Sequence, residues 1–222
     1  MAKVKEMTQD ELEQFIEQKV IEILGDPDEG LSLNEAFKEK LKKGNKDKIL
    51  FLGRIAPIKN VGVLIKAIKL LNNKKINLVL AGPVEQNYGK ELKNLVHNLG
   101  IENQISFIGP VCGLKKKIRL IRNSGIFVLP SKREAMPQSL LEAMALGKIV
   151  VSSGTKGGKE FIVNGKNGFL FYKNNEKELA KMLDYCMTNF NRLSKIRLNA
   201  KKYASNLKWA DIADRLEKLY MP

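Results

Sequence analysis

From residue 48 onward, short apolar runs alternate with segments of helical periodicity, and this alternation constrains the fold more than any other feature. The apolar runs occupy 48–54, 76–82, 105–110, 125–131, 148–154 and 168–172. They are continuous rather than interleaved with polar residues, as in a parallel sheet that helices cover on both faces. Between the first two runs, segment 61–71 places Val61, Leu64, Ile65, Ile68 and Leu71 on one helical face. The pattern predicts an α/β fold with a doubly wound, Rossmann-like parallel sheet.

The remaining periodic segments predict the helices of this fold and a different N-terminal part. Helices are expected near 87–99, 113–123, 137–147 and 158–163, and three more close the chain at 175–189, 190–205 and 208–221, where Trp209 packs. Residues 1–47 contain two helical segments and no strand, and S-L-N-E at 32–35 is a capping box. We therefore expect a helical arm or linker over 1–47 and a Rossmann-like domain with C-terminal helices over 48–222.

Composition narrows the classes of function. The chain has 222 residues, a formal net charge of +15, two cysteines and one histidine. No apolar run reaches the roughly 18 residues of a membrane span, and the N-terminus lacks the apolar region of a signal peptide. Cys112 and Cys186 have no metal-type spacing, and the single His97 excludes a His-rich metal site. These features indicate a reducing, cytoplasmic setting.

The basic charge has two readings. Lys and Arg cluster in 42–48, 115–122 and 195–202. These clusters are either solvated helix faces or contacts for an anionic partner, which means nucleic acid, anionic lipid or a phosphorylated small molecule. Few aromatic residues lie among them, which argues against binding of single-stranded nucleic acid by base stacking.

Glycine and charged residues follow the predicted strands at their carboxyl ends, where open parallel sheets bind ligands. Gly53, Arg54 and Lys59 follow the first strand, and Gly82 follows the second. Val111 follows the third strand, S-K-R-E-A-M-P-Q-S follows the fourth, and S-S-G-T-K-G-G-K-E follows the fifth. We expect these loops to meet at one edge of the sheet.

A phosphate ligand accounts for much of this set. A helix that begins with Pro137 as its first residue would offer free N–H groups and the positive end of its dipole. Arg54 and Lys59 could clamp a diphosphate. Glu142, one turn into the helix, could accept two hydrogen bonds from a vicinal diol, with Glu134 on the loop accepting bonds from other hydroxyls. Each residue alone also fits a surface charge, a loop acid or a buried ion-pair partner, but their combination is more specific.

The same helix carries an expected core face of Leu141, Met144 and Ala145, opposite Glu142. Its flanking residues give the chain a recognisable pattern. The motifs are F-L-G-R-I-A-P-I-K-N (51–60), F-I-G-P-V (107–111), V-L-P-S-K-R-E-A-M-P-Q-S-L-L-E-A-M-A-L-G (128–147) and G-G-K-E-F-I-V-N-G-K-N-G-F-L (157–170). With its pair of glutamates eight residues apart, the chain resembles, over about 48–222, the nucleotide-sugar-binding C-terminal domain of retaining GT-B glycosyltransferases of glycosyltransferase family 4.

The resemblance implies roles for individual residues. Arg54 and Lys59 would bind the donor diphosphate, Glu134 the donor sugar and Glu142 the ribose, and Glu134, Arg54 and Lys59 would be the catalytic residues. The backbone near Val111 would read the base, and the amides of Ser139 and Leu140 would meet the phosphates. The rest of the donor site would comprise Gly53, Gly82, Ala135 and Met136.

The resemblance also implies a reaction and its partners. The enzyme would transfer a hexose with retention from a UDP-, GDP- or ADP-sugar to a sugar or lipid-linked acceptor in cell-surface polysaccharide synthesis. It would need no cofactor or metal and bind no nucleic acid. It would be cytoplasmic, with basic segment 115–122 able to contact the anionic inner face of a membrane.

Two departures from the family pattern leave alternatives open. Ala135 stands where the family usually has glycine after the first glutamate, so a methyl group could narrow the choice of donor. An N-terminal, acceptor-binding Rossmann domain has no counterpart in residues 1–47. We therefore expect a C-terminal half, from a truncated or a split enzyme. The alternatives are a non-enzymatic nucleotide- or partner-binding module and, on charge alone, a nucleic-acid-binding protein.

Overall fold

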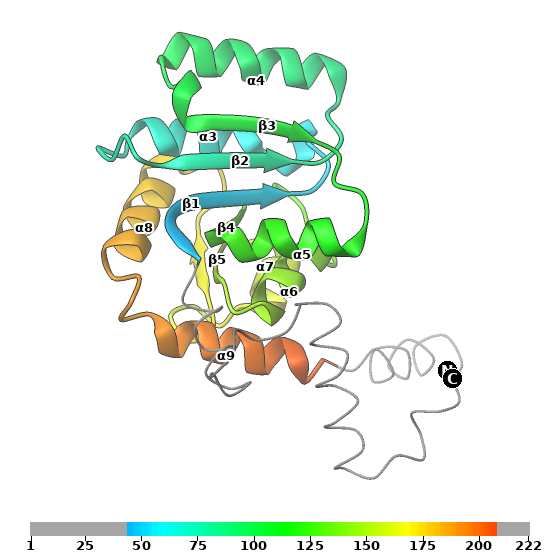
Figure 1. Ribbon diagram of the computed structural model, residues 1–222, viewed down its shortest axis with the longest axis vertical. Helices are drawn as coiled ribbons and strands as arrows, with labels where there is room; N and C mark the ends of the chain where they lie inside the picture. The colour runs from blue at the N-terminus through cyan, green and yellow to red at the C-terminus, as the bar shows by residue number, and fades with distance from the viewer. Residues whose placement is uncertain (1–43, 208–222) are drawn as a thin grey trace, which may run out of the picture. The chain divides into compact units, whose positions relative to one another are not determined.

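A six-stranded parallel sheet forms the centre of the computed structural model, which describes residues 44–207 (Figure 1). The strands are β1 (Asn45–Leu52), β2 (Asn77–Ala81), β3 (Ile105–Gly109), β4 (Ser124–Leu129), β5 (Ile149–Ser153) and β6 (Phe169–Phe171). Their order is β3-β2-β1-β4-β5-β6, and every neighbouring pair is parallel. This is the doubly wound order, so the predicted fold class is confirmed.

Helices cover both faces of the sheet. They are α3 (Val61–Lys69), α4 (Gln86–Leu99), α5 (Leu114–Asn123), α6 (Gln138–Ala145), α7 (Lys156–Phe161), α8 (Glu176–Thr188) and α9 (Ser194–Ser205), with short 3-10 turns η1 (Pro57–Lys59) and η2 (Glu102–Gln104). Helix α3 packs against α4 and α8 on one face, while α5 and α6 pack on the other, where α9 contacts α6 (Figure 1). Right-handed crossovers require this division, because the chain runs outward from β1 to β3 and then returns to β4.

The core lies between the sheet and these helices. Leu50 of β1 and Phe127 of β4 are fully buried, as continuous apolar strands require. On α3, Val61, Leu64, Ile65 and Ile68 are also fully buried, as predicted. The fifth residue of the predicted face, Leu71, lies after the end of the helix at Lys69 and is half-buried. Each such side chain contributes about 1.5 to 3 kcal/mol relative to exposure, so the sheet forms a stable platform for the loops at its edges.

Two local predictions differ from the structure. Strand β1 begins at Asn45, three residues before the apolar run, because Asn45 pairs with Ser124 while its own side chain stays exposed. Helix α6 begins at Gln138, so Pro137 is its N-cap and not its first residue. The first residues of β1 are polar, and the capping position of α6 depends on backbone geometry. A pattern of apolar residues therefore predicts neither boundary.

The predicted core face of α6 was also wrong in part. Met144 is fully buried as expected, but its buried neighbours are Leu140 and Ala143, while Leu141 is half-buried and Ala145 is exposed. Helix α6 packs against β4 and β5 and also against α9. The contact with α9 turns Leu141 and Ala145 toward a groove between the two helices, and a single-helix pattern does not reveal this second partner.

Some predictions lie outside the described residues. These are the helices expected in 1–43, the helix at 208–221 and the packing of Trp209, so the division into 1–47 and 48–222 stays a prediction. Among the helices of residues 44–207, none combines the length and the apolar character needed to cross a bilayer.

Candidate functional site

A pocket of about 510 Å³ opens at the carboxyl edge of the sheet, between the loops that follow β1, β4, β5 and β6. We call it the basic pocket, because its described lining includes six cationic side chains: Arg54, Lys59, Lys132, Arg133, Lys156 and Lys173. Glu134 and Ala135 lie among them. The structure thus brings Arg54, Lys59, Glu134 and Ala135 together, as the sequence predicted from their places after two neighbouring strands.

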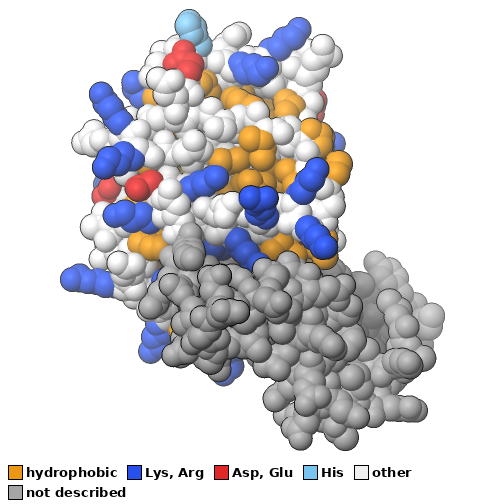
Figure 2. Space-filling model, viewed as in Figure 1, with side chains coloured by type: hydrophobic (Ala, Val, Ile, Leu, Met, Phe, Trp, Pro, Cys, Tyr) orange, Lys and Arg blue, Asp and Glu red, His pale blue; other side chains and the backbone are white. Residues whose placement is uncertain are grey.

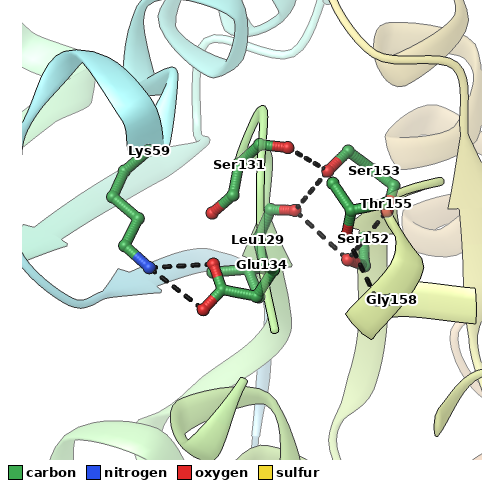
Figure 3. A network of polar contacts seen from close by, with 8 residues as sticks. All are labelled: Lys59, Leu129, Ser131, Glu134, Ser152, Ser153, Thr155 and Gly158. Carbon is green, nitrogen blue, oxygen red and sulfur yellow. Dashed lines mark hydrogen bonds and ion pairs between the residues drawn. The ribbon is translucent and has the colours of Figure 1, made fainter. Parts of the chain in front are cut away.

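Lys59 and Glu134 form an ion pair in this pocket (Figure 3). The Lys59 Nζ atom donates to both carboxylate oxygens, at 2.8 and 3.1 Å. Their side chains are 22% and 10% exposed, so the pair is shielded from much of the solvent. Lys59 holds the Glu134 carboxylate in one position. A ligand hydroxyl that donates to this carboxylate would bind beside the Lys59 ammonium group.

Hydrogen bonds between loops fix the position of the segment that carries Glu134. The Lys132 N–H donates to the Ile58 carbonyl at 2.8 Å, which joins the loops after β4 and β1. The Ser153 hydroxyl at the end of β5 donates to the Ser131 carbonyl at 2.5 Å (Figure 3). These bonds hold the loop after β4 against the loop after β1 and the end of β5.

The glycine pair Gly157 and Gly158 has a role that the sequence analysis did not predict. The Gly157 N–H donates to the Glu134 carbonyl at 3.0 Å. A Cβ atom at Gly157 would lie 2.6 Å from that oxygen and 2.7 Å from the Ala135 carbonyl, so only glycine permits this approach. Gly158 is similarly close to Ser153, and its N–H bonds to the Thr155 hydroxyl at 3.1 Å. Gly157 therefore positions the backbone of Glu134.

Two glycines predicted for the site hold strand ends together. A Cβ atom on Gly82, whose φ is +137°, would lie 2.0 Å from the Gly53 carbonyl oxygen. The Gly82 N–H donates to the Gly109 carbonyl at 2.7 Å. The ends of β1, β2 and β3 are thus stacked backbone against backbone, and Arg54, which follows Gly53, is exposed beside this stack.

Glu142 faces a different hollow. It lines a groove of about 350 Å³ between α6 and α9, together with Met136, Ala204 and Leu207. Its Oε1 atom accepts a bond from Lys117 of α5 at 2.5 Å. Its Oε2 atom is buried and has no hydrogen-bond partner among the described residues. Glu134 and Glu142 therefore line two separate hollows. Lys117, which pairs with Glu142, was not predicted as a site residue, although it lies in the basic segment 115–122.

The segment leading into α6 contributes to both hollows, with Ala135 lining the basic pocket and Gln138 lining the groove. The Leu140 N–H donates to the Pro137 carbonyl at 3.0 Å, and the Leu140 side chain is fully buried. Within residues 44–207, the Ser139 N–H has no acceptor. The free amide at this helix end is therefore that of Ser139. Val111, half-buried in the loop between β3 and α5, lies where the loop after the third strand was expected to be.

Other charged groups lie away from these hollows. His97 pairs with Glu102 through a 2.9 Å bond, and the pKa of Glu102 is lowered by its own backbone N–H and by this bond. Figure 2 shows Lys and Arg side chains spread over the face on which α5 lies, with few acidic ones. In the part of the chain that the structure describes, no group of three His, Cys, Asp or Glu side chains could hold a metal ion.

Known proteins share both the sequence pattern and the fold. Residues 33–203 match the model of the family described as glycosyl transferases group 1. An uncharacterized glycosyltransferase of Methanocaldococcus jannaschii, MJ1069, is 31% identical over 221 residues, which cover 94% of this chain and 54% of the relative. The N,N'-diacetylbacillosaminyl-diphospho-undecaprenol alpha-1,3-N-acetylgalactosaminyltransferase of Campylobacter jejuni is 32% identical, with coverage of 84% and 47%. The chain spans about half the length of the curated relatives it matches.

Solved structures of glycosyltransferases share the fold of this chain. Anabaena HepE in complex with UDP-glucose superposes with a TM-score of 0.72 at 25% identity, over 86% of this chain and 53% of that one. The C-terminal domain of the group 1 glycosyl transferase LpcC from Francisella tularensis superposes with a TM-score of 0.66 at 26% identity. That match covers 76% of this chain and 89% of the LpcC domain, so the likeness extends over nearly all of that domain.

Proposed function

This chain belongs to the group 1 glycosyl transferase family, and we propose that it binds the nucleotide-diphospho-sugar donor across the start of α6. The observation that carries the proposal is that the segment leading into α6 lines two hollows, Glu134 and Ala135 the basic pocket and Met136 and Gln138 the groove. One presents Arg54, Lys59 and Glu134, and the other presents Glu142. Arginine and lysine form charge-assisted hydrogen bonds with a diphosphate, and carboxylates accept hydrogen bonds from sugar hydroxyls.

Each side chain has a role in this proposal. Arg54 and Lys59 bind the diphosphate and stabilise the charge that develops on it as the glycosidic bond breaks. The unpartnered Oε2 of Glu142 accepts a ribose hydroxyl, which removes the cost of a buried, unsatisfied oxygen. Glu134 accepts hydroxyls of the transferred hexose, the Ser139 amide meets a phosphate, and backbone near Val111 contacts the base.

The reaction itself is part of the proposal. The hexose is transferred with retention of its anomeric configuration, and the leaving diphosphate assists on the same face of the sugar. The donor is a UDP-, GDP- or ADP-sugar, and transfer uses these basic residues in place of a cofactor or metal. The anomeric configuration of a product, read by NMR, tests retention, and an inverted product would contradict it.

Calorimetry of the chain with UDP, GDP and ADP tests donor binding. We expect one diphosphate to bind more tightly than its monophosphate and nucleoside. Glu142→Gln should weaken binding of the ribonucleotide about tenfold, the effect of losing one hydrogen bond to a charged group, and should leave the 2′,3′-dideoxy analogue unchanged. Glu91→Gln, an exposed change on α4, is the matched control. A folded protein that binds none of the three diphosphates would contradict the proposal.

A second domain is expected for the acceptor. Because the chain spans about half the length of its curated relatives, we propose that another Rossmann-like domain, from the same or a separate chain, binds a sugar or lipid-linked acceptor. Transfer that appears only when such a domain is present would support a two-part enzyme. Tight binding of a partner without any transfer would favour the alternative of a non-enzymatic nucleotide- and partner-binding module.

We also propose a cytoplasmic location with contact to an anionic membrane surface through α5. Leu114 at the start of this helix is 66% exposed, beside the exposed Lys115 and Lys116. Sedimentation with vesicles containing 30% or so of an anionic phospholipid, against neutral ones, tests this contact at low salt. Equal recovery with both vesicles would contradict it.

A further inference from the structure

The basic pocket carries more positive charge than a nucleotide diphosphate requires. Among its described lining residues, six side chains are cationic and one, Glu134, is a carboxylate, which already pairs with Lys59. Lys132, Arg133, Lys156 and Lys173 form no ion pair within residues 44–207. A nucleotide-sugar diphosphate carries two negative charges, and Arg54 and Lys59 are enough to match them.

Hydrogen bonds hold together the loops that carry three of these four cations, Lys132, Lys156 and Lys173. Lys132 is joined to the loop after β1 by its bond to Ile58 O. Lys156 precedes Gly157, whose N–H bonds to the Glu134 carbonyl at 3.0 Å. Lys173 precedes Asn174, which has a left-handed backbone with a φ of 62° and accepts a 2.9 Å bond from the Asn60 side chain.

Like charges held in this way repel one another, and the lining offers no second carboxylate among the described residues. The result is a local positive potential in the basic pocket that exceeds the charge of a diphosphate. An anion bound there removes the repulsion and gains charge-assisted hydrogen bonds.

We propose that the basic pocket binds a second anionic group, a carboxylate or a phosphate, next to the transferred sugar. This inference rests on the proposed function for the placement of the sugar. The anion has two sources: a donor hexose that carries a carboxylate, or an acceptor that carries a phosphate. Lys156 and Lys173, from the loops after β5 and β6, are the residues that contact it.

Calorimetry with paired ligands tests the donor source. With whichever base binds, the pairs are UDP-glucose against UDP-glucuronic acid, or GDP-mannose against GDP-mannuronic acid. We expect the acidic sugar nucleotide to bind at least fivefold more tightly. The variant Lys156→Met/Lys173→Met should remove this preference, while Lys177→Met/Lys181→Met, which removes two exposed lysines from α8, should keep it.

The acceptor source is tested with the nucleotide diphosphate already bound. Glucose 1-phosphate is compared with glucose, and geranyl diphosphate with geraniol. The wild type and the α8 variant Lys177→Met/Lys181→Met should bind the phosphate-bearing ligand of each pair at least fivefold more tightly. The pocket variant Lys156→Met/Lys173→Met should show no such preference. No preference for an anion in either arm, or equal losses in the pocket and α8 variants, would overturn the inference. If no nucleotide diphosphate binds, the proposed function fails, and glucose 1-phosphate against glucose, without nucleotide, still decides the second anion.

Discussion

Cationic side chains lie at both edges of the sheet, in opposite surroundings. At the carboxyl edge, Arg54 and Lys156 are exposed at the mouth of the basic pocket. At the amino edge, Lys148 precedes β5 and is 3% exposed, and its Nζ donates to the carbonyl of Arg122 at the end of α5 at 2.7 Å. Burial lowers the pKa of Lys148 to about 8, with the charges of Arg197 and Arg122 adding to the effect.

The difference separates a structural cation from ligand-binding ones. Lys148 satisfies a carbonyl at a helix C-terminus, where a positive charge is favourable, and stability bears the cost of its desolvation. The exposed cations of the pocket, such as Arg54 and Lys156, keep their hydration, so they cause no comparable desolvation cost and can exchange water for an anion. The same residue type thus serves the fold at one edge and, in our proposal, a ligand at the other.

The largest expected effects come from glycines whose backbone packs closely against a neighbouring strand, one at each edge of the sheet. Gly82→Ala places a Cβ atom 2.0 Å from Gly53 O at the carboxyl edge, and Gly125→Ala places one 2.5 Å from Asn45 O at the amino edge. Each should lower the free energy of unfolding by about 3 kcal/mol through overpacking or strain. Gly100→Ala, with a left-handed φ but open space, should cost only about 1 kcal/mol. Urea denaturation measures all three, and equal losses would refute the packing argument.

Arg54→Met should affect binding and leave stability nearly unchanged. We expect the affinity for the nucleotide diphosphate to fall by about 1.5 to 3 kcal/mol, the range for hydrogen bonds to charged groups. Because the Arg54 side chain is exposed, unfolding should change by less than about 0.5 kcal/mol. Lys66→Met, on the exposed face of α3, is the control. Unchanged affinity for Arg54→Met in calorimetry would remove Arg54 from the diphosphate site.

Lys148 should make stability depend on pH. The pKa of Lys148 is about 8 in the folded protein, well below its ordinary value of 10.5. Between these two pH values the unfolded chain binds more protons than the folded protein, so stability rises with pH. From pH 7.5 to 9 the gain should be about 1 kcal/mol in urea denaturation. Burial raises the pKa of Cys186 to about 12, which lowers stability above pH 9 and sets the upper limit of the range. A Lys148→Met variant with the same rise would show that another group titrates.

The smallest expected effect concerns the ion pair between Lys59 and Glu134. Glu134→Gln removes a negative charge from the pocket and frees Lys59, so a nucleotide diphosphate should bind more tightly by about 0.5 to 1 kcal/mol. The matching nucleotide sugar should gain less, because the glutamine amide accepts weaker hydrogen bonds from the sugar hydroxyls, and through one oxygen where the carboxylate has two. Calorimetry with both ligands, and Glu160→Gln as an exposed control, measures the difference. Weaker binding of the diphosphate would mean that Glu134 positions Lys59 rather than competing for it.

Much of the fold and part of the site followed from the sequence. The continuous apolar runs and the periodic segments between them predicted the order of strands and helices. A strand that helices cover on both faces of the sheet must be apolar throughout, so it is easy to recognise in the sequence. Strand ends then placed Arg54, Lys59 and Glu134 at one edge. The role of Gly157 did not follow, since a glycine pair reads equally well as a turn, and only the 2.6 Å approach to Glu134 O distinguishes the two.

The sequence by itself determined which loops meet, because parallel strands bring their carboxyl ends to one edge. Only the tertiary structure decided which partner each charged side chain has at that edge. It paired Lys59 with Glu134 and Lys117 with Glu142, and it turned the two glutamates into separate hollows. It also buried Lys148 while leaving Lys156 exposed. The physical reason is that ion pairing and desolvation depend on distances between segments far apart in the chain, which periodicity and composition do not encode.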